Sequence, residues 1–222
     1  MRLTRQVVFW STLLFGVSAV AELPSSYRTD RWEGSFRVIG LQSEDVVGEN
    51  GSRADIDGDV GFGFDFAYNH DEHLALGMAL EWVDTDFRST SQSDAGNIAF
   101  DGRGDLEMTT FNLNGTYHFT DKALAPYVHA ALGATYLDTN VPTGPSVPVC
   151  WWDPWWGYYC GLDTPTLNDT VFSSELGVGM RLDVNDRFFV RGGYSRQWLD
   201  VDRGAGTVEL GLWRFGIGSF FY

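Results

Sequence analysis

The feature that most constrains this chain is a two-residue alternation of side chains, which recurs in segment after segment. From residue 60 to 68 every second position is a large apolar residue, and the positions between hold glycine, alanine and Asp65. Successive side chains of a β-strand point to opposite faces, so this spacing predicts a strand with one strongly apolar face. The same pattern is found at 32–42, 74–83, 110–119, 127–136, 172–182, 188–197 and 207–222. The chain is therefore predicted to be all-β, with eight antiparallel strands.

Parity alone does not say which face of these strands points outward, and a soluble barrel would turn its apolar face inward. Three features favour contact with lipid. The apolar face carries no charge, aromatic residues recur towards the strand ends, and the opposite face mixes glycine with charged residues. Those charged residues are Arg37, Asp65, Glu81, Glu175, Arg181 and Arg191. We expect an eight-stranded, antiparallel, up-and-down transmembrane β-barrel.

The connections between the predicted strands alternate between short and mostly long ones. The short ones are 69–73, 120–124 and 185–187, and the long ones lie at about 42–55, 88–104, 138–169 and 200–206. Outer-membrane barrels show this asymmetry, with short periplasmic turns and longer extracellular loops. The long connections are therefore predicted to be extracellular.

The first 21 residues have the pattern of a secretory signal peptide. Arg2 and Arg5 precede an apolar run at 7–17, and Ala19-Val20-Ala21 supplies a small-x-small cleavage site. An uncleaved anchor helix is the alternative, but about 11 apolar residues are short for a hydrocarbon layer of ~30 Å. We expect cleavage after Ala21, which leaves one barrel domain at 22–222.

Net charge limits the partners of the exported chain. The formal charge is −15, and loss of Arg2 and Arg5 makes it −17. A chain this acidic repels phosphates and releases no counterions from them, so nucleic acid is not an expected partner. Acidic residues are expected to gather at the loops and the barrel rim.

Three sequence stretches carry a family resemblance: GSFFY at 218–222, APYVHAALG at 125–133 and GVGM at 177–180. In these the chain resembles the small outer-membrane β-barrel proteins of Gram-negative bacteria, in particular the OmpW-like and OmpX/OmpA-barrel group. The resemblance covers essentially all of 22–222. It implies an outer-membrane location, both termini in the periplasm, lipid and lipopolysaccharide as surroundings, and recognition of the C-terminal aromatic segment by the barrel-assembly machinery.

The longest connection contains the two cysteines of the chain, Cys150 and Cys160, with only one pairing possible. In an oxidising compartment they are expected to form a structural disulfide. The bracketed segment holds the aromatic residues Trp151, Trp152, Trp155, Trp156, Tyr158 and Tyr159. Two interpretations remain open: a rigid aromatic platform that binds sugars, lipid headgroups or a protein, or rings that pack together and only order the loop.

The charged lumen-parity residues suggest an ion-pair network that plugs the barrel. Eight strands leave an interior just wide enough for side chains, so an aqueous pore is not expected. We predict a non-enzymatic surface-interaction or envelope-integrity role. The alternative is a narrow channel for small hydrophobic solutes, as in OmpW-like proteins, which requires an apolar upper funnel.

Other motifs carry less weight. Lipid A deacylases place a His-x-Ser pair on a strand, whereas His129-Ala130-Ala131 lacks the serine, so a lipid A-modifying enzyme is only a minor alternative. The tripeptide at 103–105 (RGD) is best explained by chance. The stretch 55–59 (DIDGD) does not match a calcium-binding EF-hand. Neither a cofactor nor a metal site is expected.

The last predicted strand contains a conflict of parity. Phe220 and Tyr222 share a parity with Arg214, whereas Trp213, Phe215 and Phe221 share the other. A glycine bulge at Gly216 or Gly218 would shift the register and reconcile them.

Overall fold

The computed structural model describes residues 25–47, 53–92, 98–142, 144–155, 157–201 and 206–221. Within these ranges the chain is built from β-strands. Their bounds are β1 Arg31–Leu41, β2 Glu44–Val47, β3 Arg53–Ile56, β4 Val60–Asn69, β5 Leu74–Gln92, β6 Ile98–His118, β7 Leu124–Pro142, β8 Val147–Asp153, β9 Gly157–Asp163, β10 Thr166–Asp183, β11 Phe188–Val201 and β12 Gly206–Phe221. The predicted signal peptide lies outside the described residues.

Eight of these strands close into a ring. Each strand pairs antiparallel with its neighbours in the order β5-β4-β1-β12-β11-β10-β7-β6, and β6 pairs with β5 to complete the circle. The first and last strands meet over a long register, from Trp32 opposite Phe221 to Leu41 opposite Leu212. Closure leaves the ring without an unpaired edge, which confirms the predicted eight-stranded antiparallel barrel.

Among the described residues no helix is long and apolar enough to cross a membrane.

The alternation along each strand separates two environments. On β4 the Phe64 side chain is 53% exposed, whereas its neighbour Asp65 is 4% exposed. The outward set is large and apolar around the whole ring, and in water so much contiguous apolar surface would be a severe liability. It suits a hydrocarbon layer, where the closed ladder also satisfies every backbone group.

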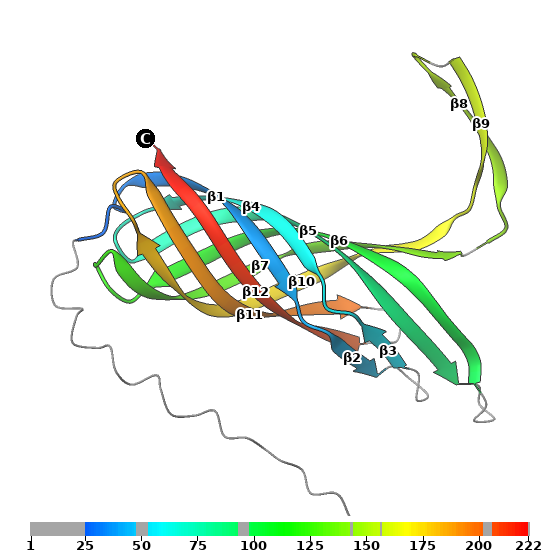
Figure 1. Cartoon of the computed structure of the whole chain (residues 1–222), viewed down its shortest axis with the longest axis horizontal. Helices are drawn as coiled ribbons and strands as arrows, with labels where there is room; N and C mark the ends of the chain where they lie inside the picture. The colour runs from blue at the N-terminus through cyan, green and yellow to red at the C-terminus, as the bar shows by residue number, and fades with distance from the viewer. Residues whose placement is uncertain are drawn as a thin grey trace, which may run out of the picture.

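The two ends of the barrel differ, as Figure 1 shows. One end, the turn end, holds the short connections and both ends of the described chain; the other, the hairpin end, holds the long strand extensions. Two of the short turns are closed by side chains. Asp71 Oδ1 accepts hydrogen bonds from the backbone N–H groups of His73 and Leu74, both at 2.7 Å, and Asn185 does the same for Arg187 and Phe188 at 2.8 Å. Residues that mimic a backbone turn thus make these tight connections possible.

Strand pairing extends far into the connections predicted as loops. β5 and β6 stay paired up to Gln92 opposite Ile98, so most of 88–104 is a β-hairpin. β2 and β3 pair with each other in the connection 42–55, and β3 also pairs with β5. In 138–169, β8 and β9 form a separate two-stranded sheet. These extensions are rich in polar residues and lack the alternating large apolar residues that mark the ring strands, so the sequence pattern did not predict them as strands.

β12 corrects the prediction of a glycine bulge. Its pairing with β1 and with β11 runs through Gly216 and Gly218 without a register shift. Phe220 therefore points inward, where it is buried and packs on Phe189 with ring centroids 5.2 Å apart. The parity conflict between Phe220 and Arg214 therefore needs no bulge. Both side chains point into the lumen, which contains aromatic rings as well as charges at the turn end.

The lumen changes character along the barrel axis, which one strand illustrates. The inward residues of β1 are, from the turn end, Glu33, Ser35, Arg37, Ile39 and Leu41. The two apolar ones belong to a buried cluster at the hairpin end, contributed by several ring strands and β3: Ile39, Leu41, Ile56, Val83, Met108, Val171, Leu199, Leu210 and Leu212. The polar lumen is thus covered by an apolar layer, which the alternation of the strands did not predict.

Candidate functional site

The centre of the lumen is organised around Arg214, which reaches in from β12. Its Nε and Nη2 donate to the two oxygens of Glu81 at 2.9 and 2.7 Å. Its Nη1 and Nη2 donate to Glu175 at 2.7 and 2.9 Å. One guanidinium therefore holds two carboxylates from opposite sides of the barrel, and such charge-assisted forks are among the stronger protein hydrogen bonds.

Asp65 forms the second node of the same network. It pairs with Arg37, and its Oδ1 accepts from Arg191 Nη2 at 2.7 Å. Asn114 Nδ2 donates to its other oxygen at 2.9 Å. Arg37 also contacts Glu81 at 3.1 Å, which joins this node to Arg214. Six strands thus send charges to one connected cluster.

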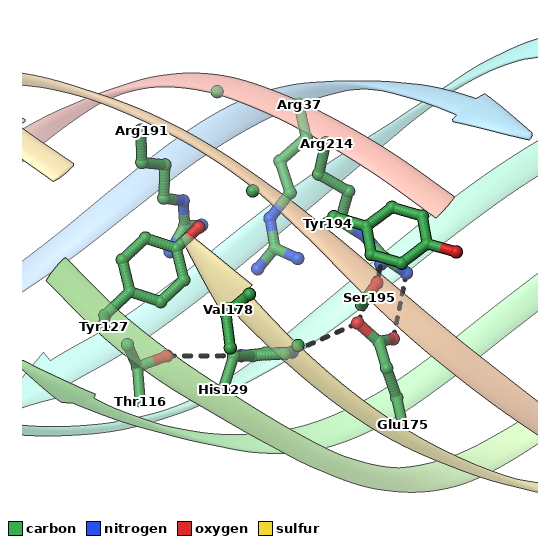
Figure 2. Close-up of a pocket in the computed structure, with 13 residues that line it drawn as sticks. Arg37, Thr116, Tyr127, His129, Glu175, Val178, Arg191, Tyr194, Ser195 and Arg214 are labelled. Carbon is green, nitrogen blue, oxygen red and sulfur yellow. Dashed lines mark hydrogen bonds and ion pairs between the residues drawn. The ribbon is translucent and has the colours of Figure 1, made fainter. Parts of the chain in front are cut away.

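A cavity of about 30 Å³ lies within this cluster, and Figure 2 shows its lining. His129 lies between Thr116, 3.2 Å from its Nδ1, and Glu175, 3.5 Å from its Nε2. Ser195 accepts a hydrogen bond from Arg214, a donor that stays protonated and so does not act as a general base. The cavity has room for water and none for an organic solute.

A second charged cluster lies closer to the turn end. Arg181 donates to both oxygens of Glu33 at 3.0 and 2.8 Å and to Asp183 at 2.8 Å. Its guanidinium also lies 3.8 Å from the ring centroid of Phe189, a cation–π distance. Arg191 Nη1, 4.0 Å from Glu33, connects the two clusters.

The structure thus places five of the six predicted lumen residues in the central cluster, namely Arg37, Asp65, Glu81, Glu175 and Arg191, and puts Arg181 in the second. Sequence reasoning missed Arg214, Glu33 and Asp183. Arg214 has the right parity, but the expected bulge obscured it. Glu33 lies in a segment predicted as a strand. Its alternation with the outward-facing Trp32 could have placed it in the lumen.

The second candidate is the β8–β9 hairpin, here called the aromatic arm. Figure 1 shows it turning away from the barrel axis beyond the hairpin end. Cys150 lies opposite Cys160, and a disulfide joins them across the two strands. The turn ends at Gly157, whose φ of 77° suits glycine. A two-stranded hairpin is marginal alone, so the disulfide fixes both its register and its fold.

The described aromatic side chains of the arm are highly exposed. Trp152 and Tyr158, neighbours across the hairpin, are 63% and 78% exposed, and Trp155 in the turn is 88% exposed. The side chains of Trp151, Trp156 and Tyr159 lie outside the described part of the structure. Among the described rings of the arm, those of Trp152, Trp155 and Tyr158 are therefore accessible at its surface.

The motifs set aside from sequence lie at the hairpin end. The tripeptide 103–105 is part of β6. In the strand register Arg103 lies opposite Arg88 of β5, and Asp105 accepts a hydrogen bond from Asn140 Nδ2 at 2.8 Å. A strand held in this way does not display the motif as an open loop does. Asp86 and Asp105 face each other across β5 and β6. Among the described residues, no group of three or more His, Cys, Asp or Glu side chains is placed to hold a metal ion.

The geometry defines the class of protein first. A closed antiparallel ring with an apolar outer surface, short turns at one end and a charged interior is the construction of a transmembrane β-barrel. Comparison with protein families then identifies the family to which the chain belongs. Residues 8–221 match the outer membrane protein beta-barrel domain, so the chain belongs to that family and resides in the bacterial outer membrane. We propose that the turn end is periplasmic and the hairpin end extracellular, because outer-membrane barrels have short periplasmic turns and longer extracellular loops.

Solved structures of outer-membrane proteins are similar to this chain at low sequence identity. Neisserial surface protein A is 12% identical, with a TM-score of 0.51 and coverage of 89% of this chain and 99% of that one. Ail of Yersinia pestis, solved with the heparin analogue sucrose octasulfate, is 13% identical, with a TM-score of 0.46 over 87% and 99%. OprG of Pseudomonas aeruginosa is 13% identical, with a TM-score of 0.46 over 88% and 97%. Comparison with curated protein sequences gave no match.

Proposed function

We propose that this outer-membrane barrel is a non-enzymatic protein with a surface-interaction or envelope-integrity role, and that its aromatic arm is the binding element. The observation that carries the proposal is the exposure of Trp152, Trp155 and Tyr158 on a hairpin closed by a disulfide. Tryptophan and tyrosine offer large contact areas at a small cost in conformational entropy, and a rigid hairpin lowers that cost further.

The filled lumen supports the same proposal, because it opposes the passage of solutes. Side chains of the two ion-pair clusters fill the periplasmic half and centre, and the apolar layer fills the extracellular part. A solute would have to break buried ion pairs to pass. The barrel serves best as a rigid anchor for the arm.

The test replaces all four arm tryptophans, Trp151, Trp152, Trp155 and Trp156, by serine. Proteoliposomes carrying either form are applied to arrays of immobilised glycans, lipopolysaccharide and extracellular-matrix proteins. Retention of the wild type and its loss in the variant support the platform. Equal retention on every probe, with only a lower melting temperature in the variant, contradicts it. The control is Phe172→Ser, which removes one exposed aromatic ring from ring strand β10, away from the arm. It tests whether loss of any exposed ring lowers retention.

A channel for small hydrophobic solutes is the second candidate, and the apolar layer is the observation that favours it. The nine buried residues of that layer give the extracellular half of the lumen an apolar lining. They pack against one another, so this route requires them to separate. The flux measurement described in the Discussion distinguishes the two functions.

An enzyme that modifies lipid A is the least supported reading. His129 contacts Thr116 and Glu175, and Ser195 is held by Arg214. A serine nucleophile needs a neighbouring base that accepts its proton, and a guanidinium does not supply one. The chain therefore functions without a catalytic residue or cofactor in this proposal.

Three further points of the proposal concern export and assembly. Residues 1–21 are removed as a signal peptide. The aromatic C-terminal segment, which ends β12, is recognised by the barrel-assembly machinery. Lipopolysaccharide surrounds the extracellular half of the apolar outer surface. Mass spectrometry of the mature N-terminus and assembly yields of a Phe221→Ala variant test the first two.

A further inference from the structure

The segment before the first strand crosses the periplasmic mouth of the barrel. Ser25 forms a bridge with Lys122, and Ser26 N donates to Asp121 O at 2.8 Å, both in the β6–β7 turn. Asp30, with a φ of 53°, turns the chain into β1 in a conformation that aspartate tolerates better than most residues. This segment, 25–30, is here called the N-terminal strap.

Arg28 of the strap points into the barrel and is fully buried. Its Nη2 donates to the backbone carbonyls of Thr120 and Lys122 at 2.8 and 3.2 Å. Its Nη1 lies 3.6 Å from Asp183 Oδ2. Nη2 therefore has two carbonyl acceptors and Nη1 faces a carboxylate, while Nη1 and Nε make no hydrogen bond among the described residues. The socket is matched to a guanidinium in charge and in its carbonyl acceptors.

The charge count of the lumen explains why the socket is needed. The ring strands bury five carboxylates, Glu33, Asp65, Glu81, Glu175 and Asp183, and four arginines, Arg37, Arg181, Arg191 and Arg214. Five minus four leaves one uncompensated negative charge. The uncompensated charge lies at Asp183. Arg181 Nε donates to Oδ1 of Asp183, whereas Oδ2 of Asp183 has no hydrogen bond among the described residues.

We propose that the periplasmic mouth is a guanidinium-binding site and that the strap is its resident ligand, which closes the mouth and supplies the fifth positive charge of the lumen. The strap is also tied at its other end. Tyr68 donates to Asp30 at 3.2 Å, and Arg31 donates to the carbonyl of Asp186 in the β10–β11 turn at 2.7 Å. Arg28 thus locks a segment that spans the mouth between two turns.

The experiment compares Arg28→Ala with Lys122→Met in the full-length protein folded into lipid vesicles. Both variants remove one positive charge at the periplasmic end, but the Lys122 side chain is about half exposed and only its backbone carbonyl lines the socket. We expect Arg28→Ala to lower the urea midpoint of unfolding clearly and Lys122→Met to leave it nearly unchanged. Equal shifts would overturn the proposal, because net charge alone would then explain the effect.

Chemical rescue tests the socket itself. A ligand that binds only the folded state raises stability once its concentration exceeds its Kd. Millimolar methylguanidinium should therefore raise the midpoint of Arg28→Ala and leave the wild type unchanged, and methylammonium, with the same charge but no planar fork, should restore less. Absence of rescue by methylguanidinium refutes the site. If Arg28→Ala does not fold, the same salts are added during refolding, and the folded yield replaces the midpoint with the same expected order.

Discussion

Arg214 shows how much one residue can contribute in a closed lumen, because Glu81 and Glu175 both depend on it. Arg214→Met keeps the length of the side chain and leaves two carboxylates without this partner. Breaking a buried pair typically costs about 3–5 kcal/mol. We expect a loss of this size in urea unfolding of the folded barrel.

The matched control is Arg196→Met. Arg196 pairs with Glu209 at 2.8 Å, but both side chains are about half exposed. Water and salt screen such a pair, so the urea midpoint should hardly move. Equal effects of the two variants would show that burial of the ion pairs does not govern stability.

We expect a pH response at the hairpin end, where Asp86 and Asp105 lie opposite each other. A hydrogen bond that protonated Asp86 donates to Asp105, together with desolvation and the charges of neighbouring acids, raises the pKa of Asp86. A raised pKa means that this pair stabilises the folded hairpin at acid pH and loses that contribution as pH rises through the raised value. Carbon-13 NMR titration should show the Asp86 pKa falling towards ~3.9 in Asp105→Asn. An unchanged Asp86 titration would contradict the contact.

At the scale of the element, alternation along the ring strands other than the end of β12 predicted the face on which a residue lies, but not its height along the barrel axis or its partner. Parity placed Phe64 and Asp65 on opposite faces, because a strand has only two faces. The lack of charge on the apolar face then identified the side that meets lipid. The pairing of Glu33 with Arg181 joins residues 148 positions apart and depends on register, which parity does not contain. Arg28 was missed for another reason: it lies before the first strand, where no periodic pattern exists.

The aromatic arm is the element whose order depends most on one covalent bond. Closing a small loop with a disulfide contributes about 2–3 kcal/mol. Cys150→Ser with Cys160→Ser should therefore loosen β8 and β9 while the ring, which shares no ladder with them, keeps its melting temperature. Limited proteolysis should cut the variant within 144–165 much faster than the wild type. A lower melting temperature of the whole barrel would show that the arm packs on the ring.

The whole molecule has the composition of a water-soluble domain, with 44% apolar residues, but distributes them differently. Most of the exposed large apolar residues form the outer surface of the ring, and the others lie mainly on the aromatic arm. The charges are divided between the lumen and the parts of the chain beyond the apolar surface. Folding therefore requires a hydrocarbon phase. The unheated protein should migrate differently from the boiled protein on a denaturing gel, as an intact closed ladder resists unfolding.

Transport across the molecule depends on three barriers in series: the strap, the ion-pair clusters and the apolar layer. The charged barriers contain paired groups, and an ion that enters must replace those partners in a region of low dielectric constant. We expect planar bilayers with the wild-type protein to show no stepwise conductance, and loaded liposomes to show no release of small apolar solutes above that of empty lipid. Saturable release of apolar solutes that disappears when Leu210 is replaced by aspartate would instead establish the hydrophobic channel and overturn the anchor role of the barrel. Because Leu210 is buried in the apolar layer, such a result would also locate the route.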